Sequence, residues 1–196
     1  MLAAPESGFV FLATTKTGST AIENSFARHA QIVARRPVSL KHVNVRAFNF
    51  SFAPILATHG YKRGTYELVC VVREPVDWAA SWWRYRSRPE SAGRPSYTGD
   101  MSFDAFAEQI IAGEVDLGSL AAFVERKDGS IGIDRMWRYE HIDKMAEWMA
   151  AKIGIPTPPL KPANVSPDRQ TVVAPSTRVR LEEFYARHLE LYEAAI

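Results

Sequence analysis

Residues 9–26 of the chain are FVFLATTKTGSTAIENSF, and our interpretation of the fold starts from this stretch. The apolar run from Phe9 to Ala13 is short enough for a buried strand, and it ends in a turn-prone segment that contains Gly18. A helix is expected to follow, with Ser19 or Thr20 as its N-cap. A strand, a short turn and a helix direct several backbone N–H groups and the positive end of a helix dipole at one anion. The stretch therefore predicts a phosphate-binding turn.

The side chains of this turn indicate which phosphate ligand it binds. Lys16 adds a mobile positive charge, and Thr17, Ser19 and Thr20 add hydroxyl donors. A nucleotide-triphosphate loop has the pattern G-x-x-x-x-G-K-[ST], but here Lys16 precedes Gly18 and no Gly-Lys-Ser/Thr occurs. The order K-T-G-S-T resembles instead the 5′-phosphosulfate loop of the sulfotransferase family, whose members use 3′-phosphoadenosine 5′-phosphosulfate (PAPS) as donor. The alternative is an ordinary strand-to-helix turn with a solvated lysine.

A second segment supports the same resemblance. The apolar run from Tyr66 to Val72 predicts a central parallel strand that stops at Arg73, and Pro75 begins a helix that carries Ser81. A guanidinium and a hydroxyl so placed can both reach one phosphate. In the sulfotransferase family an Arg-x-Pro followed by a helical Ser holds the ribose 3′-phosphate, and Arg73, Pro75 and Ser81 match that pattern. The alternative is an arginine that ends a strand and a serine bonded within its own helix.

The same strand argues against a metal-dependent nucleotide site. In nucleotide-triphosphate enzymes a second apolar strand usually ends in an Asp that helps to hold Mg²⁺, whereas this strand ends in Arg73. We therefore expect no metal.

Two weaker matches lie further along the chain. Residues 138–142, RYEHI, are similar to the Tyr-Glu-Asp-Leu segment of the family, which implies that Tyr139 lies near the adenine. Residues 161–166, KPANVS, resemble the C-terminal part of carbohydrate-type members. The Arg-Lys-Gly triplet with which some members clasp the 3′-phosphate is absent after Tyr139, and Arg169 is a candidate substitute.

Sulfuryl transfer also needs a base for the acceptor hydroxyl and a cation for the leaving phosphate. Lys16 is the candidate cation. His59 is the first candidate base, because it follows a predicted strand at 55–58 and α/β sheets bind ligands at the carboxyl ends of their strands. His42 is the second candidate and Glu23 the third. Each histidine has the alternative of a surface or structural role.

The composition of the chain limits its number of domains, its ligands and its location. The chain has 196 residues, 46% hydrophobic and 23% charged, which predicts one globular domain over residues 1–196. Basic residues outnumber acidic ones in residues 1–100, which suits an anionic ligand, but the net charge of +2 does not indicate nucleic acid. Cys70 is the only cysteine, so the chain forms no internal disulfide, and we expect a cytoplasmic location. The apolar runs are too short to cross a bilayer, and we expect no membrane span.

Predicted strands at 9–13, 55–58, 66–72 and 131–139 alternate with predicted helices, which include 102–112, 117–125, 142–153 and 176–195. This alternation predicts an α/β fold with a parallel β-sheet flanked by helices in three layers. The resemblance implies a P-loop NTPase-like sulfotransferase fold.

The functional hypothesis is sulfuryl transfer from PAPS to an acceptor hydroxyl on a small molecule or a glycan, leaving adenosine 3′,5′-bisphosphate (PAP). Two alternatives stay open: a Mg²⁺-dependent small-molecule kinase or nucleotide hydrolase, and a non-catalytic module that binds the bisphosphate nucleotide. No motif in the sequence specifies the acceptor or the oligomeric state.

Overall fold

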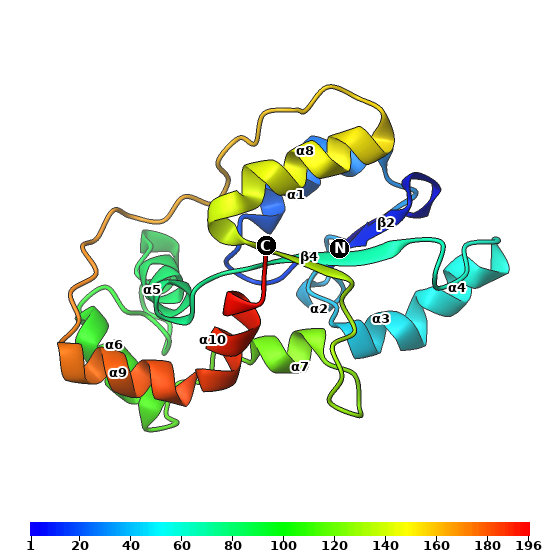
Figure 1. The fold of residues 1–196 in the computed structure, drawn as a ribbon. Helices are drawn as coiled ribbons and strands as arrows, with labels where there is room; N and C mark the ends of the chain where they lie inside the picture. Colours follow the sequence, from blue (N-terminus) through cyan, green and yellow to red (C-terminus); the bar gives the residue numbers. More distant parts are fainter.

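The computed structural model describes residues 1–196 and contains a five-stranded mixed β-sheet with helices on both faces (Figure 1). The strand order is β3-β1-β2-β4-β5. The strands span Leu2–Ala4 (β1), Phe9–Phe11 (β2), Ile32–Val33 (β3), Glu67–Val72 (β4) and Arg135–Arg138 (β5).

Ten α-helices surround the sheet. They span Ser19–Phe26 (α1), Val38–Lys41 (α2), Val45–Ser51 (α3), Ala53–Thr58 (α4), Pro75–Arg86 (α5), Phe103–Ile111 (α6), Leu120–Val124 (α7), Ile142–Ile153 (α8), Pro175–Phe184 (α9) and Ala186–Glu193 (α10). Short 3₁₀ turns lie at Pro5–Ser7 (η1), Ala27–His29 (η2), Pro89–Ser91 (η3) and Tyr139–His141 (η4). None of the helices is long and apolar enough to cross a membrane.

Only part of the sheet is parallel, so the prediction of a purely parallel sheet is wrong. β4 runs parallel to β2 and to β5, but β1 is antiparallel to both β2 and β3. The connection from β1 to β2 is the short η1 turn followed by Gly8, which adopts a left-handed conformation (φ 79°). A connection of this length joins antiparallel strands, because a parallel pair needs a long crossover.

The two faces of the sheet contribute to two hydrophobic clusters. In β4, Leu68, Cys70 and Val72 face a cluster that includes residues of α3, α4 and α7. Val69 and Val71 face the opposite cluster, with residues of α1 and α8. This alternation is the period of a β-strand, and it explains why the β4 sequence is apolar throughout. A third cluster joins α5, α6 and α9 beyond the end of β4 (Figure 1).

Several predicted elements are confirmed. The strand predicted at 66–72 is β4, and the helix predicted at 142–153 is α8, which ends at Gly154 with a left-handed φ of 79°. Ser102 caps α6 by accepting a hydrogen bond from the backbone N–H of Ala105. These elements carry their own start and stop signals in the sequence.

The strand predicted at 55–58 is wrong, since these residues belong to α4. Pro54 lies in the first turn of that helix, where a proline needs no N–H partner. His59 follows α4 and is exposed. Tyr61 donates a hydrogen bond to Glu6 of η1, just before β2. His59 therefore lies near the amino ends of the parallel strands, and its expected place at their carboxyl ends is wrong.

The end of the chain also differs from expectation. The helix predicted at 176–195 is divided at Tyr185 into α9 and α10. Val179 and Phe184 are about half exposed (52% and 51%), whereas Leu181 and His188 are buried. The strand predicted at 131–139 shortens to β5. Ile131 forms an isolated bridge with Glu125 after α7, and residues 139–141 form η4.

Candidate functional site

The turn between β2 and α1 contains a run of backbone donors without partners. Lys16 and Gly18 both have positive φ angles, 61° and 71°. The backbone N–H groups from Thr15 to Thr20 donate to no acceptor in the protein, and no side chain caps α1. Consecutive N–H groups in such a turn form a concave site for an anion, and the positive end of the helix dipole favours negative charge.

Two features of the turn require glycine at position 18: its positive φ angle and the close packing of other side chains against it. A Cβ atom at position 18 would lie 2.8 Å from Cδ1 of Ile142 and 3.5 Å from Cε2 of Tyr139. The junction between η4 and α8 therefore packs directly against the turn, and Tyr139 lies beside it. Only glycine combines a left-handed φ with this close approach.

The hydroxyl groups of the turn serve partly to hold its shape. The Thr14 hydroxyl donates to the Val71 carbonyl, which ties the turn to β4. The hydroxyls of Thr14 and Thr17 are 2.9 Å apart. The Thr20 hydroxyl accepts a hydrogen bond from Nζ of Lys41 at 2.8 Å. Ser19 is buried at the first position of α1.

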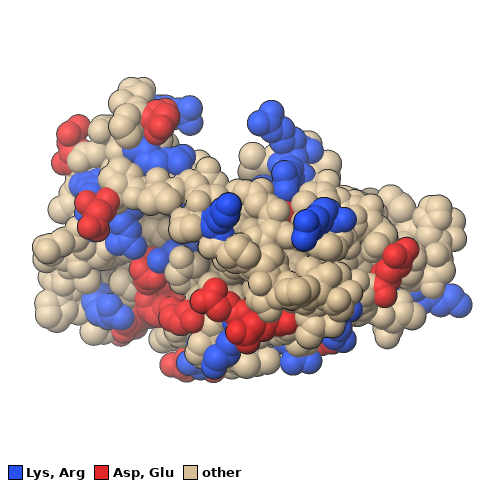
Figure 2. Space-filling view, turned by 90° about the horizontal axis from the view of Figure 1, so that it is seen from above, with Lys and Arg blue, Asp and Glu red and all other residues tan.

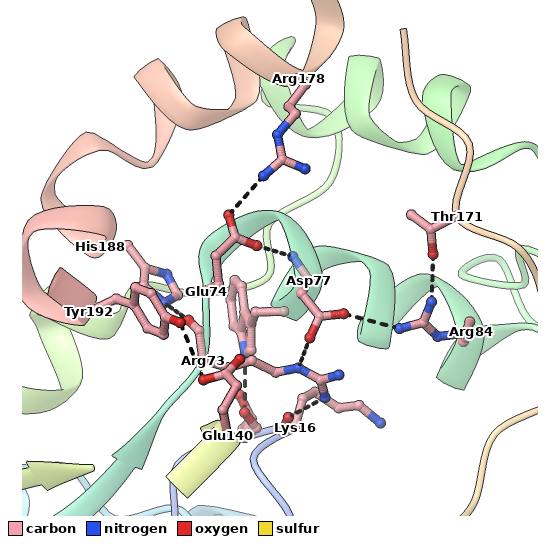
Figure 3. Close-up of polar contacts among 12 residues, drawn as sticks. Lys16, Arg73, Glu74, Asp77, Arg84, Glu140, Thr171, Arg178, His188 and Tyr192 are labelled. Carbon is pink, nitrogen blue, oxygen red and sulfur yellow. Dashed lines mark hydrogen bonds and ion pairs between the residues drawn. The ribbon is translucent and has the colours of Figure 1, made fainter. Parts of the chain in front are cut away.

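Arg73 joins the end of β4 to this turn (Figure 3). Its Nε donates to the Asp77 carboxylate at 2.5 Å, and one of its terminal nitrogens donates to the Lys16 carbonyl at 3.1 Å. The guanidinium carbon lies 4.3 Å from the centre of the Tyr139 ring. The structure thus brings together Lys16, Arg73 and Tyr139, which the sequence analysis had assigned to one nucleotide site.

Helix α5 adds positive charge beside Lys16. Nζ of Lys16 lies 3.9 Å from the centre of the Tyr85 ring, and the Arg88 guanidinium lies 3.8 Å from the same centre. Burial, reinforced by the charges of Arg88, Arg73 and Arg84, lowers the pKa of Lys16 to about 7. Asp77 balances only part of this charge, through its ion pairs with Arg73 and Arg84 (Figure 3). An anion at this place would relieve the repulsion among the cations.

Ser81 lies on the same helix, four residues after Asp77 and three before Arg84, so the three residues share one face of α5. It is half-buried, and its hydroxyl forms no hydrogen bond with another residue. The structure shows no direct contact between Ser81 and Arg73. Asp77 links Arg73 to Arg84 through ion pairs with both arginines.

A cavity of about 150 Å³ opens beside the turn, at the carboxyl ends of β2 and β4. Its walls include Thr15, Thr17 and Arg73 from the anion site, and His42 and His188 from two other segments. An anion bound by the turn and a second ligand in the cavity would therefore be neighbours.

His42 is the candidate base that the structure brings to this place. Its Nδ1 lies 2.6 Å from the Ala13 carbonyl, and since a carbonyl can only accept, Nδ1 carries the proton. Nε2 therefore keeps a free lone pair. Burial lowers the pKa of His42 below its ordinary value. The ring is neutral at pH 7 and can accept a proton.

The other two candidate bases lie elsewhere or are already paired. His59, beyond the amino end of β4, does not line the cavity. Glu23 is buried on α1, where its carboxylate pairs with the Met1 ammonium at 2.8 Å and with Nζ of Lys41 at 3.4 Å. These ion pairs occupy the carboxylate, and Glu23 does not line the cavity.

His188 of α10 is a site residue that sequence reasoning missed. It is only 5% exposed and lines the cavity. Its Nε2 lies 2.9 Å from the Arg73 carbonyl, while its Nδ1 is buried without a partner. Burial lowers the pKa of His188 to about 4. The spacing of Leu181, Tyr185 and His188 marks one helix face and could have indicated that this histidine is buried.

Arg169, the candidate substitute for the 3′-phosphate clasp, forms its hydrogen bonds within the protein. Its two terminal nitrogens donate to the carbonyls of Thr98 and Met101, and its guanidinium lies 3.8 Å from the centre of the Trp83 ring. Arg169 therefore ties the loop before α9 to the loop before α6. Arg84 and Arg88, in contrast, are close enough to Lys16 to lower its pKa.

The protein surface around α8 carries both signs of charge (Figure 2). Lys and Arg side chains are spread over this face, and acidic side chains gather toward one edge of it. No group of three or more His, Cys, Asp or Glu side chains is arranged to hold a metal ion.

Comparison with known proteins adds no relative: no protein-family model, no curated protein and no solved structure matches this chain. The function is therefore inferred from the residues of the site.

Proposed function

We propose that the protein is a sulfotransferase that moves a sulfuryl group from PAPS to an acceptor hydroxyl, on a variant of the P-loop-like sulfotransferase fold. The observation that carries this proposal is the run of unpartnered N–H groups from Thr15 to Thr20, with Lys16 and Arg73 beside it. This arrangement supplies donors and positive charge, whereas β4 ends in Arg73 in place of the usual Mg²⁺-binding Asp. The carboxylates that follow are already engaged, since Glu74 caps α5 and Asp77 pairs with Arg73 and Arg84. An anionic nucleotide that binds without a metal fits this set of groups.

The residues of the turn fit PAPS as follows. The N–H groups from Thr15 to Thr20, together with Lys16, hold the 5′-phosphosulfate. Arg73 and Ser81 hold the 3′-phosphate, with further positive charge from Arg84 and Arg88. Tyr139, which already stacks on Arg73, lies near the adenine. Lys16 and the N–H groups stabilise the negative charge that develops on the leaving phosphate.

His42 acts as the base in this proposal. Its Nε2 lone pair belongs to a neutral imidazole that lines the cavity beside the turn. When PAPS is bound, the acceptor oxygen forms the new bond to sulfur, the old sulfur–oxygen bond breaks with its electron pair on the phosphate, and His42 takes the acceptor proton.

The donor site is tested by calorimetric titration with PAP in EDTA and, separately, with ATP and Mg²⁺. We expect tight binding of PAP that does not depend on metal, because the donors and cations of the site are all protein groups. Preference for ATP with Mg²⁺ would contradict the proposal and favour a kinase or nucleotide hydrolase.

Catalysis is tested by the transfer of labelled sulfate from PAPS to a panel of hydroxyl acceptors. The His42→Ala variant is expected to lower the rate by roughly 10²–10⁴, the usual contribution of general base catalysis, with unchanged PAP affinity. His59→Ala is the matched control, since this exposed histidine lies away from the cavity. PAP binding without transfer to any acceptor would indicate a non-catalytic nucleotide-binding module.

A further inference from the structure

The amine of Lys16 lies on aromatic rings and has no carboxylate as its partner. Its Nζ atom is 3.9 Å from the centre of the Tyr85 ring and 5.7 Å from that of the Trp82 ring. Lys41 and Lys152, in contrast, form ion pairs with glutamates. The remaining lysines are exposed to water: Lys62, Lys127, Lys144 and Lys161. Lys16 is thus the lysine that is half-buried without a neutralising partner.

The charges around Lys16 are mostly of its own sign. Burial, together with the guanidinium groups of Arg88, Arg73 and Arg84, lowers the pKa of its amine to about 7. Asp77 forms ion pairs with Arg73 and Arg84, which leaves Arg88 and Lys16 without a carboxylate (Figure 3). The site therefore holds more positive than negative charge.

The neighbours of Lys16 also contain hydrogen-bond donors without acceptors. Nε1 of Trp82 and Nε of Arg88 are buried and have no partner in the protein. The Arg88 guanidinium lies 3.8 Å from the centre of the Tyr85 ring, the same ring that the Lys16 amine contacts. Unpaired buried donors cost free energy. The surroundings of Lys16 therefore lack acceptors as well as negative charge.

These surroundings favour the reaction of a neutral amine with dissolved CO₂. The nitrogen lone pair forms a bond to the carbon of CO₂, one carbon–oxygen π pair moves onto oxygen, and the amine releases one proton to water. The product is a carbamate, R–NH–COO⁻, and no oxidant or further reactant is needed. Because the pKa of Lys16 is about 7, most of its amine is neutral at pH 7.5, against about one in 1,000 for an unperturbed lysine.

We propose that Lys16 is a site of reversible modification by CO₂, which forms a carbamate on Nζ among the guanidinium groups of Arg73, Arg84 and Arg88. The modification replaces a positive charge by a negative one. The carbamate competes for the positive charge that attracts an anion, so CO₂ weakens anion binding at the turn between β2 and α1. The effect on PAP rests on the proposed function, whereas the carbamate rests on the surroundings of Lys16.

Carbamate formation is measured on the wild-type protein. The protein is equilibrated at pH 7.5 with ¹³C-labelled bicarbonate and carbonic anhydrase, and ¹³C NMR detects the carbamate carbon. Triethyloxonium then traps the carbamate as its ethyl ester, and peptide mass spectrometry locates the ester. We expect about tenfold more ester on Lys16 than on any exposed lysine, since the exposed amines stay protonated. Equal labelling of all lysines, or none on Lys16, would overturn the proposal.

The Arg88→Gln variant tests the role of the surrounding charge. Removing this guanidinium raises the pKa of Lys16 toward its ordinary value and takes a cation away from the carbamate, so the carbamate level should fall several-fold. Arg94→Gln is the matched control, because Arg94 is exposed in the same connection between α5 and α6. An unchanged level in Arg88→Gln, or equal losses in the two variants, would contradict the role of the guanidinium groups.

Calorimetric titration with PAP measures the consequence for binding. Wild-type protein should bind PAP several-fold more weakly in CO₂ and bicarbonate than in CO₂-free buffer of the same pH and ionic strength. Lys16→Met should bind PAP equally in the two buffers. A CO₂ effect that persists in this variant would show that bicarbonate itself competes, and would overturn the proposed regulation.

The two proposals fail in different ways. A carbamate on Lys16 without PAP binding would overturn the sulfotransferase proposal and leave the modification standing. PAP binding without any carbamate would overturn the modification and leave the donor site standing.

Discussion

Two neighbouring parallel strands, β2 and β4, each lead through a turn into a helix, yet the two helices begin differently. At α5, the Glu74 carboxylate accepts a hydrogen bond from the Asp77 N–H at 2.7 Å, and Pro75 has no N–H to satisfy. At α1, Gly18 offers no side-chain cap, and the N–H groups from Thr15 to Thr20 stay unpaired. The start of α5 is closed, because the Glu74 side chain caps it, whereas the start of α1 is open, because no side chain caps it.

This difference indicates that the starts of α1 and α5 have different roles. The open start of α1 presents donors and a positive dipole to an anion. The closed start of α5 needs no ligand, and it fixes Arg73 and Asp77 so that the arginine reaches across to the turn before α1. We therefore expect substitutions at the start of α1 to change ligand binding, and substitutions that remove the cap of α5 to change stability alone.

Arg73→Ala should give the largest effect, because it removes the contribution of α5 to the open start of α1. We expect the affinity for PAP to fall about 100-fold, since hydrogen bonds to charged groups contribute about 1.5–3 kcal/mol each. Arg73→Lys keeps the charge but loses the planar fork, and it should recover only part of the affinity. The measurement is calorimetric titration.

Arg180→Ala is the matched control for this prediction, because Arg180 pairs with Glu108 on the α6–α9 side of the molecule. It should leave PAP affinity unchanged. Equal losses in the two alanine variants would show that general positive charge, rather than Arg73, attracts the ligand.

Gly18→Ala should disturb the open helix start itself. The new Cβ would contact Ile142 at 2.8 Å, and the left-handed φ adds a backbone cost of about 1–2 kcal/mol. We expect lower stability in urea titration and a loss of PAP affinity of about tenfold, as the N–H groups turn away from the anion.

Gly154→Ala separates the two causes. Gly154 also has a left-handed φ, 79°, but nothing lies within 4 Å of its Cβ position. This variant should show the backbone cost in urea and bind PAP normally. If Gly154→Ala weakened PAP binding as much as Gly18→Ala, the packing of Ile142 and Tyr139 on the turn would have no role in the site.

Glu74→Ala should open the start of α5 and affect only stability. Removing a helix cap costs about 1 kcal/mol, and PAP affinity should stay within about twofold of wild type. Ser102→Ala, which removes the cap of α6, is the matched control and should cost a similar amount. A large loss of PAP affinity in Glu74→Ala alone would mean that the α5 cap is part of the ligand site.

The sequence was sufficient where the signals are local. β4 and α8 carry unbroken apolar patterns with their own boundaries, and both were predicted in place. The turn at Lys16 and the arginine after β4 were assigned to one site by their resemblance to the two phosphate motifs of the sulfotransferase family. The structure pairs β2 and β4 in parallel, so the carboxyl ends of both strands meet at one edge of the sheet. The structure brings them within hydrogen-bond distance.

The errors arose where tertiary contacts, rather than the local sequence, determine the structure. β1 is three residues long and has no strand signal of its own, so its antiparallel pairing depends on the η1 turn. Residues 55–58 were predicted as a strand, although Pro54 lies in the first turn of α4, where a proline is compatible with a helix, and this error misplaced His59. His188 was missed because its hydrogen bond to the Arg73 carbonyl joins two residues far apart in the sequence.

Lys16 should make PAP binding depend on pH. Its pKa in the folded protein is about 7, against 10.5 for an unperturbed lysine. The unfolded state therefore binds more protons between these values, and the contribution of Lys16 to stability should rise with pH across this window. A bound anion favours the charged lysine and raises its pKa, so PAP binding at pH 8 should take up a proton and weaken several-fold by pH 9.

Proton uptake is measured by titrating PAP at pH 8 in buffers with different ionisation enthalpies. His42 and His188 should not contribute, because burial lowers the pKa of both. A phosphate monoester, with its second pKa near 6, is also already ionised at pH 8. Lys16→Met should abolish the uptake, while Lys152→Met, on the far end of α8 beside Glu67, should not. Uptake that survives in Lys16→Met would mean that another group senses the anion, and the open start of α1 would then bind its ligand without help from the lysine.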